Sequence, residues 1–185
     1  MTKDTRIAWF ILAYPFALIA IALVLNLLLF GVTPAQLALP TRATLQMFSL
    51  AGLVLIATHI WLMTSTELTR LRHGLRATPE EWAEAGLTPD AVPDSSWREL
   101  ERRHNAHRNA TENTVYFALL ALPFCLITPN PSAVAIWLLG FAIARLGHCA
   151  SFLTGQAGWR GLFMSVGLTS LFGLASYLAI ALWIS

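Results

Sequence analysis

The fold is decided by residues 101–113, which read ERRHNAHRNATEN and run directly into the uncharged stretch 114–127. That stretch has 14 residues, and a helix of this length covers only about 21 Å of a hydrocarbon layer roughly 30 Å thick. If this helix crosses a bilayer, part of the charged segment enters the membrane with it. Charges at that depth cost several kcal/mol unless they are paired or hydrated, so they mark a candidate functional site.

Composition supports a membrane protein. Of the 185 residues, 56% are hydrophobic and 12% are charged, whereas a soluble domain carries about 25% charged residues. The net charge of +2 is too small to indicate a nucleic-acid partner. Cys125 and Cys149 lie in apolar surroundings without C-x-x-C spacing, which favours packing roles over a disulfide or a metal pair.

Four further windows are long and apolar enough to cross a membrane, namely residues 7–30, 43–63, 133–153 and 161–184. Together with 114–127 they predict an all-α, polytopic membrane bundle of five spans. The run 7–30 is too long for a signal-peptide core, and no small-residue cleavage site follows it, so we expect a retained helix.

Residues 64–96 form the one long polar stretch. Thr78 followed by Pro79 predicts a short helix, and Ser96 with Glu99 reads as a capping box that starts the next helix at about Trp97. Most Lys and Arg residues of the short connections lie in this stretch or before residue 7, which predicts that the N-terminus and the loop are cytoplasmic. The Leu- and Ala-rich composition suggests a bacterial inner membrane.

One face of the helix predicted from about Trp97 gathers amides, arginines and carboxylates. At 100° per residue, an arc of about 140° holds Glu101, Arg102, Asn105, Arg108, Asn109, Glu112 and Asn113. A solvated amphipathic helix would show the same arc, with i,i+4 pairs at Glu101–Asn105 and Arg108–Glu112.

The residues of the apolar stretch 133–153 favour a binding site over a merely solvated amphipathic helix. Arg145, His148, Cys149 and Phe152 share one helical face there, and Glu112 or Glu101 is available to pair with Arg145. Arg160 adds a cation at similar depth. The predicted pocket suits a small ligand with carboxylates and an amine. We expect His104 and His107 to face headgroups or a neighbouring helix, and His59 to form an interhelical hydrogen bond.

A known family shares these motifs. The pattern Glu101-Arg102-x-x-x-Ala106-His107-x-Asn109-x-x-Glu112-Asn113, followed by an apolar helix and a Pro-Asn-Pro turn, resembles the signature of the MAPEG family, the membrane-associated proteins of eicosanoid and glutathione metabolism. Arg145-x-x-His148, an aromatic residue at 152 and an Arg opening the last helix resemble its second block. Arg70-Leu-Arg72 resembles the basic end of its first helix.

The resemblance implies a four-helix MAPEG-like core at residues 43–185 with a cytoplasmic loop at 64–96, preceded by an extra N-terminal transmembrane helix and hairpin at 1–42. It also implies a homotrimer that holds glutathione, as co-substrate, between subunits. The glutathione contacts it implies come from Arg70 of a neighbouring subunit, Arg108, Asn109, Glu112, Arg145, His148, Phe152 and Arg160. Arg145 would be a structural or ligand-pairing cation.

Two positions depart from the family pattern. Asn105 stands where the family usually has Arg, and Phe152 stands where a Tyr is common, which removes a hydroxyl near the thiol. We therefore expect Arg160, with Ser151 or His148, to stabilise the glutathione thiolate in place of the phenol.

The predicted activity is that of a glutathione-dependent transferase or peroxidase acting on lipophilic electrophiles or lipid hydroperoxides from the bilayer. The alternative within the family is a protein that binds glutathione or a lipid but catalyses little, as the lost hydroxyl at Phe152 would favour. Glu101-x-x-His104 has the spacing of a carboxylate-bridged metal site, but such sites need the motif twice and it occurs once, so we expect no metal. A transporter is disfavoured because no inverted repeat is present.

Overall fold

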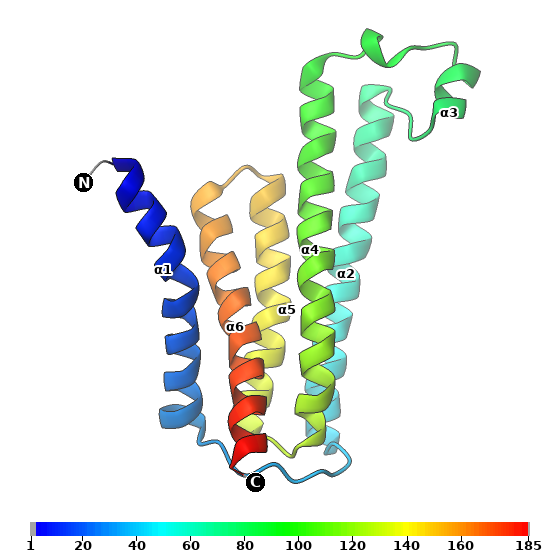
Figure 1. Cartoon of the computed structure of the whole chain (residues 1–185). Coiled ribbons are helices and arrows are strands. Elements are labelled where there is room, and N and C mark those ends of the chain that lie inside the picture. The colour runs from blue at the N-terminus through cyan, green and yellow to red at the C-terminus, as the bar shows by residue number, and fades with distance from the viewer. Residues whose placement is uncertain (1–2, 185) are drawn as a thin grey trace.

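The computed structural model describes residues 3–184 and is an all-α bundle (Figure 1). Its long helices are α1 (Lys3–Val24), α2 (Arg42–His73), α4 (Asp94–Leu126), α5 (Pro131–Leu153) and α6 (Ala157–Trp183). Three short elements complete it: the π-helix η1 (Leu25–Phe30), which continues α1, the helix α3 (Pro79–Glu84), and the 3-10 turn η2 (Pro89–Ala91). The predicted all-α membrane bundle is confirmed.

Four helices in the described part of the chain are long and apolar enough to cross a membrane: α1 with η1, α2, α5 and α6. Helix α4 is more polar because its apolar part begins only at Thr114, but it packs along α2, α5 and α6 like the others. In Figure 1, α2 and α4 extend well beyond the adjacent ends of α5 and α6 and carry α3 on a loop. The charged half of α4 therefore begins outside the bundle and descends into it.

Local signals account for the helix ends. Thr41 caps α2, since its hydroxyl accepts from the Thr44 amide at 3.1 Å, and Gly74 ends it at a φ of 66° that glycine adopts without strain. Helix α4 starts at Asp94, not near Trp97, so the predicted capping box is wrong. Pro93 has the preset φ of a helix start, and the Ser96 hydroxyl lies 3.0 Å from His73 Nδ1 of α2.

The core of the bundle is aromatic. Phe117 of α4 and Phe141 of α5 stack with centroids 4.3 Å apart, and Trp137 lies against Gly173 of α6, where a Cβ would overlap the indole. This close approach of α5 and α6 is possible because glycine has no side chain at the contact.

A buried amide attaches the first helix to the rest. Asn26 is fully buried within η1; its Oδ1 accepts from Trp137 Nε1 at 2.9 Å, and its Nδ2 donates to Gly173 O and Ser176 Oγ, each at 2.9 Å. An amide can be buried in this way because each of its polar atoms has a partner. Together these contacts fix α1 to α5 and α6.

Candidate functional site

Arg145 of α5 is the centre of the candidate site. The residue is 1% exposed, its Nη1 donates to Asn109 Oδ1 of α4 at 3.1 Å, and its Nη2 lies 3.6 Å from Met164 Sδ of α6. Its guanidinium also faces the Phe141 ring at 5.5 Å. One cation of α5 therefore contacts two neighbouring helices, α4 and α6.

No carboxylate lies within 4 Å of Arg145 among residues 3–184, so its predicted pairing with Glu112 or Glu101 is wrong. Both of those side chains are exposed, whereas Asn109 is partly buried beside α5. A buried cation in a membrane bundle normally pairs with an anion or a dense set of acceptors. Arg145 has one amide oxygen and one thioether.

Two buried nitrogen atoms of the site have no hydrogen-bond partner in the described chain: Nε of the Arg145 guanidinium and Nδ1 of His148. His148 is 4% exposed and lies one helical turn after Arg145. Buried polar atoms are nearly always satisfied, so such a pair points to a site where a bound molecule supplies the partners.

Phe152 lies between His148 and Arg160. The Arg160 guanidinium is 4.9 Å from the centre of the Phe152 ring, and the His148 ring is 5.8 Å from it. Arg160 is in the first turn of α6, so this contact joins the adjacent ends of α5 and α6. Ser151 is buried beside them, but its hydroxyl donates to Gly147 O of its own helix at 2.7 Å. Ser151 can therefore accept a hydrogen bond but does not offer a proton here.

Arg108 and Glu112 point out of the bundle. Both are exposed, and the i,i+4 pairs of the alternative, solvated-helix interpretation, Arg108–Glu112 and Glu101–Asn105, are not formed within the described residues. Glu99 forms the ion pairs of α4 instead, with Arg102 at 3.4 Å and with Arg103. Two opposite charges thus face outward just where the helix becomes apolar.

Arg70 lies apart from the other predicted contacts. Near the end of α2, it pairs with Glu67 at 2.5 Å and approaches His104 Nε2 at 3.4 Å. The predicted interhelical bond of His59 is confirmed, because its Nδ1 lies 3.1 Å from Nε2 of His107. His104 and His107 both contact α2, in agreement with the prediction that they face a neighbouring helix.

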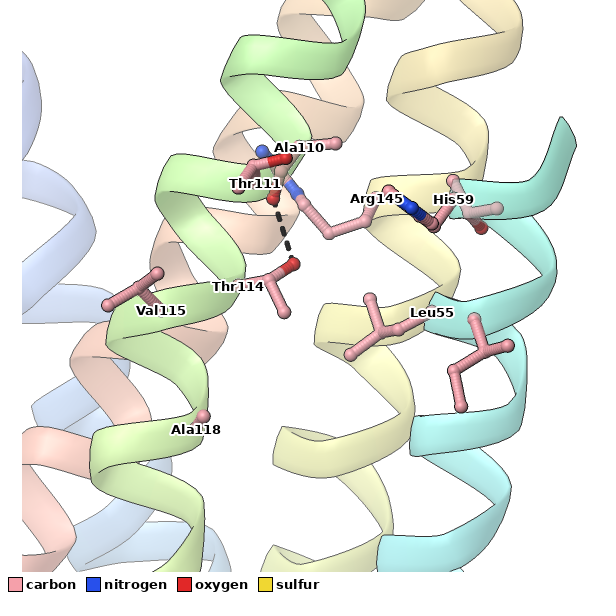
Figure 2. Close-up of a pocket in the computed structure, with 10 residues that line it drawn as sticks. Leu55, His59, Ala110, Thr111, Thr114, Val115, Ala118 and Arg145 are labelled. Atoms are coloured by element: carbon pink, nitrogen blue, oxygen red, sulfur yellow. Dashed lines mark hydrogen bonds between the residues drawn. The ribbon is translucent and has the colours of Figure 1, made fainter. Parts of the chain in front are cut away.

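A cavity of about 390 Å³ lies between α2 and α4, with Arg145 on its α5 wall (Figure 2). Most of its lining is apolar, including Leu55, Ile56, Ala110, Val115 and Ala118, with Thr and His59 side chains between them. Figure 2 shows the stem of Arg145 crossing from α5 toward Ala110 of α4. The Thr114 hydroxyl donates to Ala110 O at 2.8 Å, so its proton is not available to a molecule in the cavity.

Residues 48–180 match the model of the MAPEG family. The chain belongs to the MAPEG family. Microsomal glutathione S-transferase 1 of Rattus norvegicus is 31% identical over 111 residues, which are 60% of this chain and 72% of that protein. Prostaglandin E synthase of Equus caballus is 28% identical over 120 residues, 65% and 76% of the two chains.

The MAPEG match begins inside α2, so α1 lies outside the family's region. The structure brings Asn109, Arg145, His148, Phe152 and Arg160 into one connected group. It turns Arg108 and Glu112 outward and places Arg70 beyond the group.

Two residues of this MAPEG chain that touch the site were not predicted: Met164 and Gly167, both on α6. A Cβ on Gly167 would overlap Nη2 of Arg145. The available signal was Gly167 itself, about two turns after Arg160, but α6 holds several other small residues, including Gly161 and Gly173, so one of them could not single out a site.

Proposed function

We propose that this MAPEG protein is a glutathione-dependent membrane transferase that conjugates lipophilic electrophiles and also reduces lipid hydroperoxides. The observation that carries the proposal is Arg145, a buried cation with no carboxylate partner and a free Nε. A transferase named for glutathione among its relatives supports the choice of anion. Glutathione has two carboxylates, an amine and a thiol.

The surrounding residues suit each of these groups. Arg145 and Arg108 would pair with the two carboxylates, as guanidinium groups do in bidentate geometry. Glu112 would bind the amine, and Asn109 would hold Arg145 in place. Arg108 and Glu112 face outward, so a neighbouring subunit must close this side of the site. We therefore include a homotrimer in the proposal, with Arg70 contributed by the neighbour and the loop end of the bundle in the cytoplasm.

Arg160 is our candidate for stabilising the thiolate, with His148 beside it. A cation close to sulfur favours the ionised thiol, and the Phe152 ring holds Arg160 in place through a cation–π contact. Ser151 has a smaller part than the sequence predicts, because its proton is already donated to Gly147.

An electrophile dissolved in the bilayer would reach the thiolate sideways, and the apolar cavity beside Arg145 offers room for its hydrocarbon body. In conjugation, sulfur bonds to the electrophilic carbon while the leaving group departs with its electron pair and the thiol proton passes to water. With a hydroperoxide, sulfur attacks the terminal peroxide oxygen, the O–O bond breaks, and the alkoxide takes up a proton and leaves as the alcohol. A second glutathione then attacks the resulting sulfenic acid, forming glutathione disulfide and water.

The test uses purified protein and glutathione. Glutathione should raise the thermal unfolding midpoint, since a ligand at 100 times its Kd stabilises the folded state by about 2.7 kcal/mol. It should also give the ultraviolet absorbance of a bound thiolate, which Arg160→Ala should remove while the exposed control Arg98→Ala keeps it. If glutathione neither stabilises the protein nor ionises on it, the proposal fails.

A second candidate is a MAPEG protein that binds glutathione or a lipid with little catalysis. Phe152 favours it, because the ring occupies the place of a possible donor and can give no hydrogen bond to sulfur. The two candidates share the binding site and differ only in the chemical step.

A further inference from the structure

A second cavity lies at the opposite end of α4's polar segment, in the part of the molecule formed by the end of α2, by α3, by η2 and by the start of α4. Its volume is about 510 Å³. We call it the loop cleft. It shares no residue with the group around Arg145, and α3 and its loop lie at the extended end of the molecule in Figure 1.

One wall of the loop cleft is aromatic and apolar. Trp82 of α3 is 8% exposed, and its ring lies 6.2 Å from that of Trp97 at an angle of 30°. Leu100, Pro79 and Pro89 complete this wall. Rings held this way offer flat surfaces against which a planar group can stack.

The other side of the cleft is cationic. Arg70 and Arg76 both line it, and among residues 3–184 no Asp or Glu side chain does. Nε of Arg70 is buried without a hydrogen-bond partner, and Arg76 makes no ion pair or hydrogen bond within residues 3–184.

Three of the nearby carboxylates are already engaged. Glu67 pairs with Arg70, Glu81 accepts from the Ala77 amide at 2.8 Å, and Glu99 pairs with Arg102 and Arg103. Glu84 lines a separate pocket with Arg76 but forms no ion pair with it within residues 3–184, so the charge of Arg76 is unpaired there. His104 also lines the cleft, near these charges. Burial first, and then the charges of Arg70 and Arg108, hold its pKa below the ordinary value.

We propose that the loop cleft binds a small aromatic anion, with its ring against Trp82 and Trp97 and its acidic group on Arg76. The volume falls within the range of small-molecule sites, about 300–1,000 Å³, and an apolar lining with few polar groups is typical of them. Guanidinium groups recognise carboxylate, sulfonate and phosphate by the same paired geometry, so the acidic group is defined by charge and not by its central atom.

The test uses the full-length protein in phosphatidylcholine nanodiscs and naphthalene-2-sulfonate as the probe. Calorimetry should show saturable binding of one probe per chain, with affinity reduced about tenfold or more by Arg76→Gln, since a charge-assisted hydrogen bond is lost. The exposed arginine Arg98 is the matched control, and Arg98→Gln should bind like the wild type. Neutral 2-naphthol should bind far more weakly. Absence of saturable binding, or an equal loss in Arg98→Gln, would overturn the proposal.

A second measurement needs no variant. Phenylglyoxal modifies accessible arginines, and mass spectrometry reports the rate at each site. The probe should slow modification of Arg76 at least fivefold and leave that of Arg98 unchanged; equal rates with and without the probe would count against the site. Arg76 is not among the proposed glutathione contacts, so either result is independent of the proposed transferase activity.

Discussion

The guanidinium of Arg145 lies directly against Gly167 of the neighbouring helix, at a point where any side chain on α6 would overlap it. Asn109 holds the same group from α4. The direction of this cation is therefore set by two neighbours: one hydrogen bond and one missing side chain. A binding site that depends on a buried charge needs a fixed side chain, because an unconstrained arginine would extend its guanidinium toward water.

The first prediction concerns that missing side chain. Gly167→Ala should displace the guanidinium and weaken glutathione binding by about tenfold, which is the loss of roughly one good hydrogen bond, without removing any charge. Calorimetric titration with glutathione would measure it. Gly158→Ala is the control, since a Cβ there meets nothing within 4 Å. Equal affinities for both variants and the wild type would show that Arg145 does not need this position.

A second prediction separates the role of Arg145 in binding from its role in stability. Arg145→Met keeps an unbranched side chain but removes a buried cation that has no anion. The free energy of unfolding should change by less than about 2 kcal/mol, because replacing a buried ion with an apolar residue is often neutral or better. The rise in unfolding midpoint caused by glutathione should nevertheless disappear. A variant that keeps the full ligand-induced rise would remove Arg145 from the site.

The third prediction distinguishes the two proposed functions. Phe152→Tyr adds one hydroxyl beside His148 and Arg160. If the wild type is a transferase, its conjugation rate with 1-chloro-2,4-dinitrobenzene should be measurable. The rate of the Phe152→Tyr variant should then differ from it by less than about tenfold. An activity that arises only in Phe152→Tyr would identify the natural chain as a binding protein. Phe16→Tyr, at a 72% exposed position of α1, is a control for the added hydroxyl alone.

A fourth prediction tests the attachment of α1. Asn26→Leu should lower the free energy of unfolding by about 1–3 kcal/mol, because Trp137 Nε1 then loses its acceptor while buried. Thermal unfolding of detergent-solubilised protein would report the change. Tyr14→Phe removes a single partly buried bond to Ser165 and should have a smaller effect. An Asn26→Leu protein as stable as the wild type would show that the apolar contacts of α1 suffice.

Long apolar windows made the membrane bundle predictable, since the spacing of uncharged residues reports directly on burial in lipid. The motif residues on α4 and α5 likewise predicted the family, which the match over residues 48–180 confirms. His59 could be expected to bond across helices because a lone imidazole in a span needs a partner, and His107 supplies it.

Side-chain pairing was less predictable. Glu112 is a better electrostatic partner for Arg145 than Asn109, yet the rotation of α4 turns the carboxylate outward and the amide inward. That rotation is set by the packing of Phe117 and Ala106, three-dimensional contacts that a helical wheel does not contain. The start of α4 was missed for a similar reason, because Ser96 bonds to His73 on another helix.

The junction at Asn26 has a consequence for how the chain is made. Its amide is synthesised 111 residues before Trp137 and 150 before Ser176, the groups that later satisfy it. Until those residues emerge, η1 holds a polar group without its final partners in or beside the lipid, where such groups are costly. The docking of α1 is therefore completed only after α6 has been synthesised.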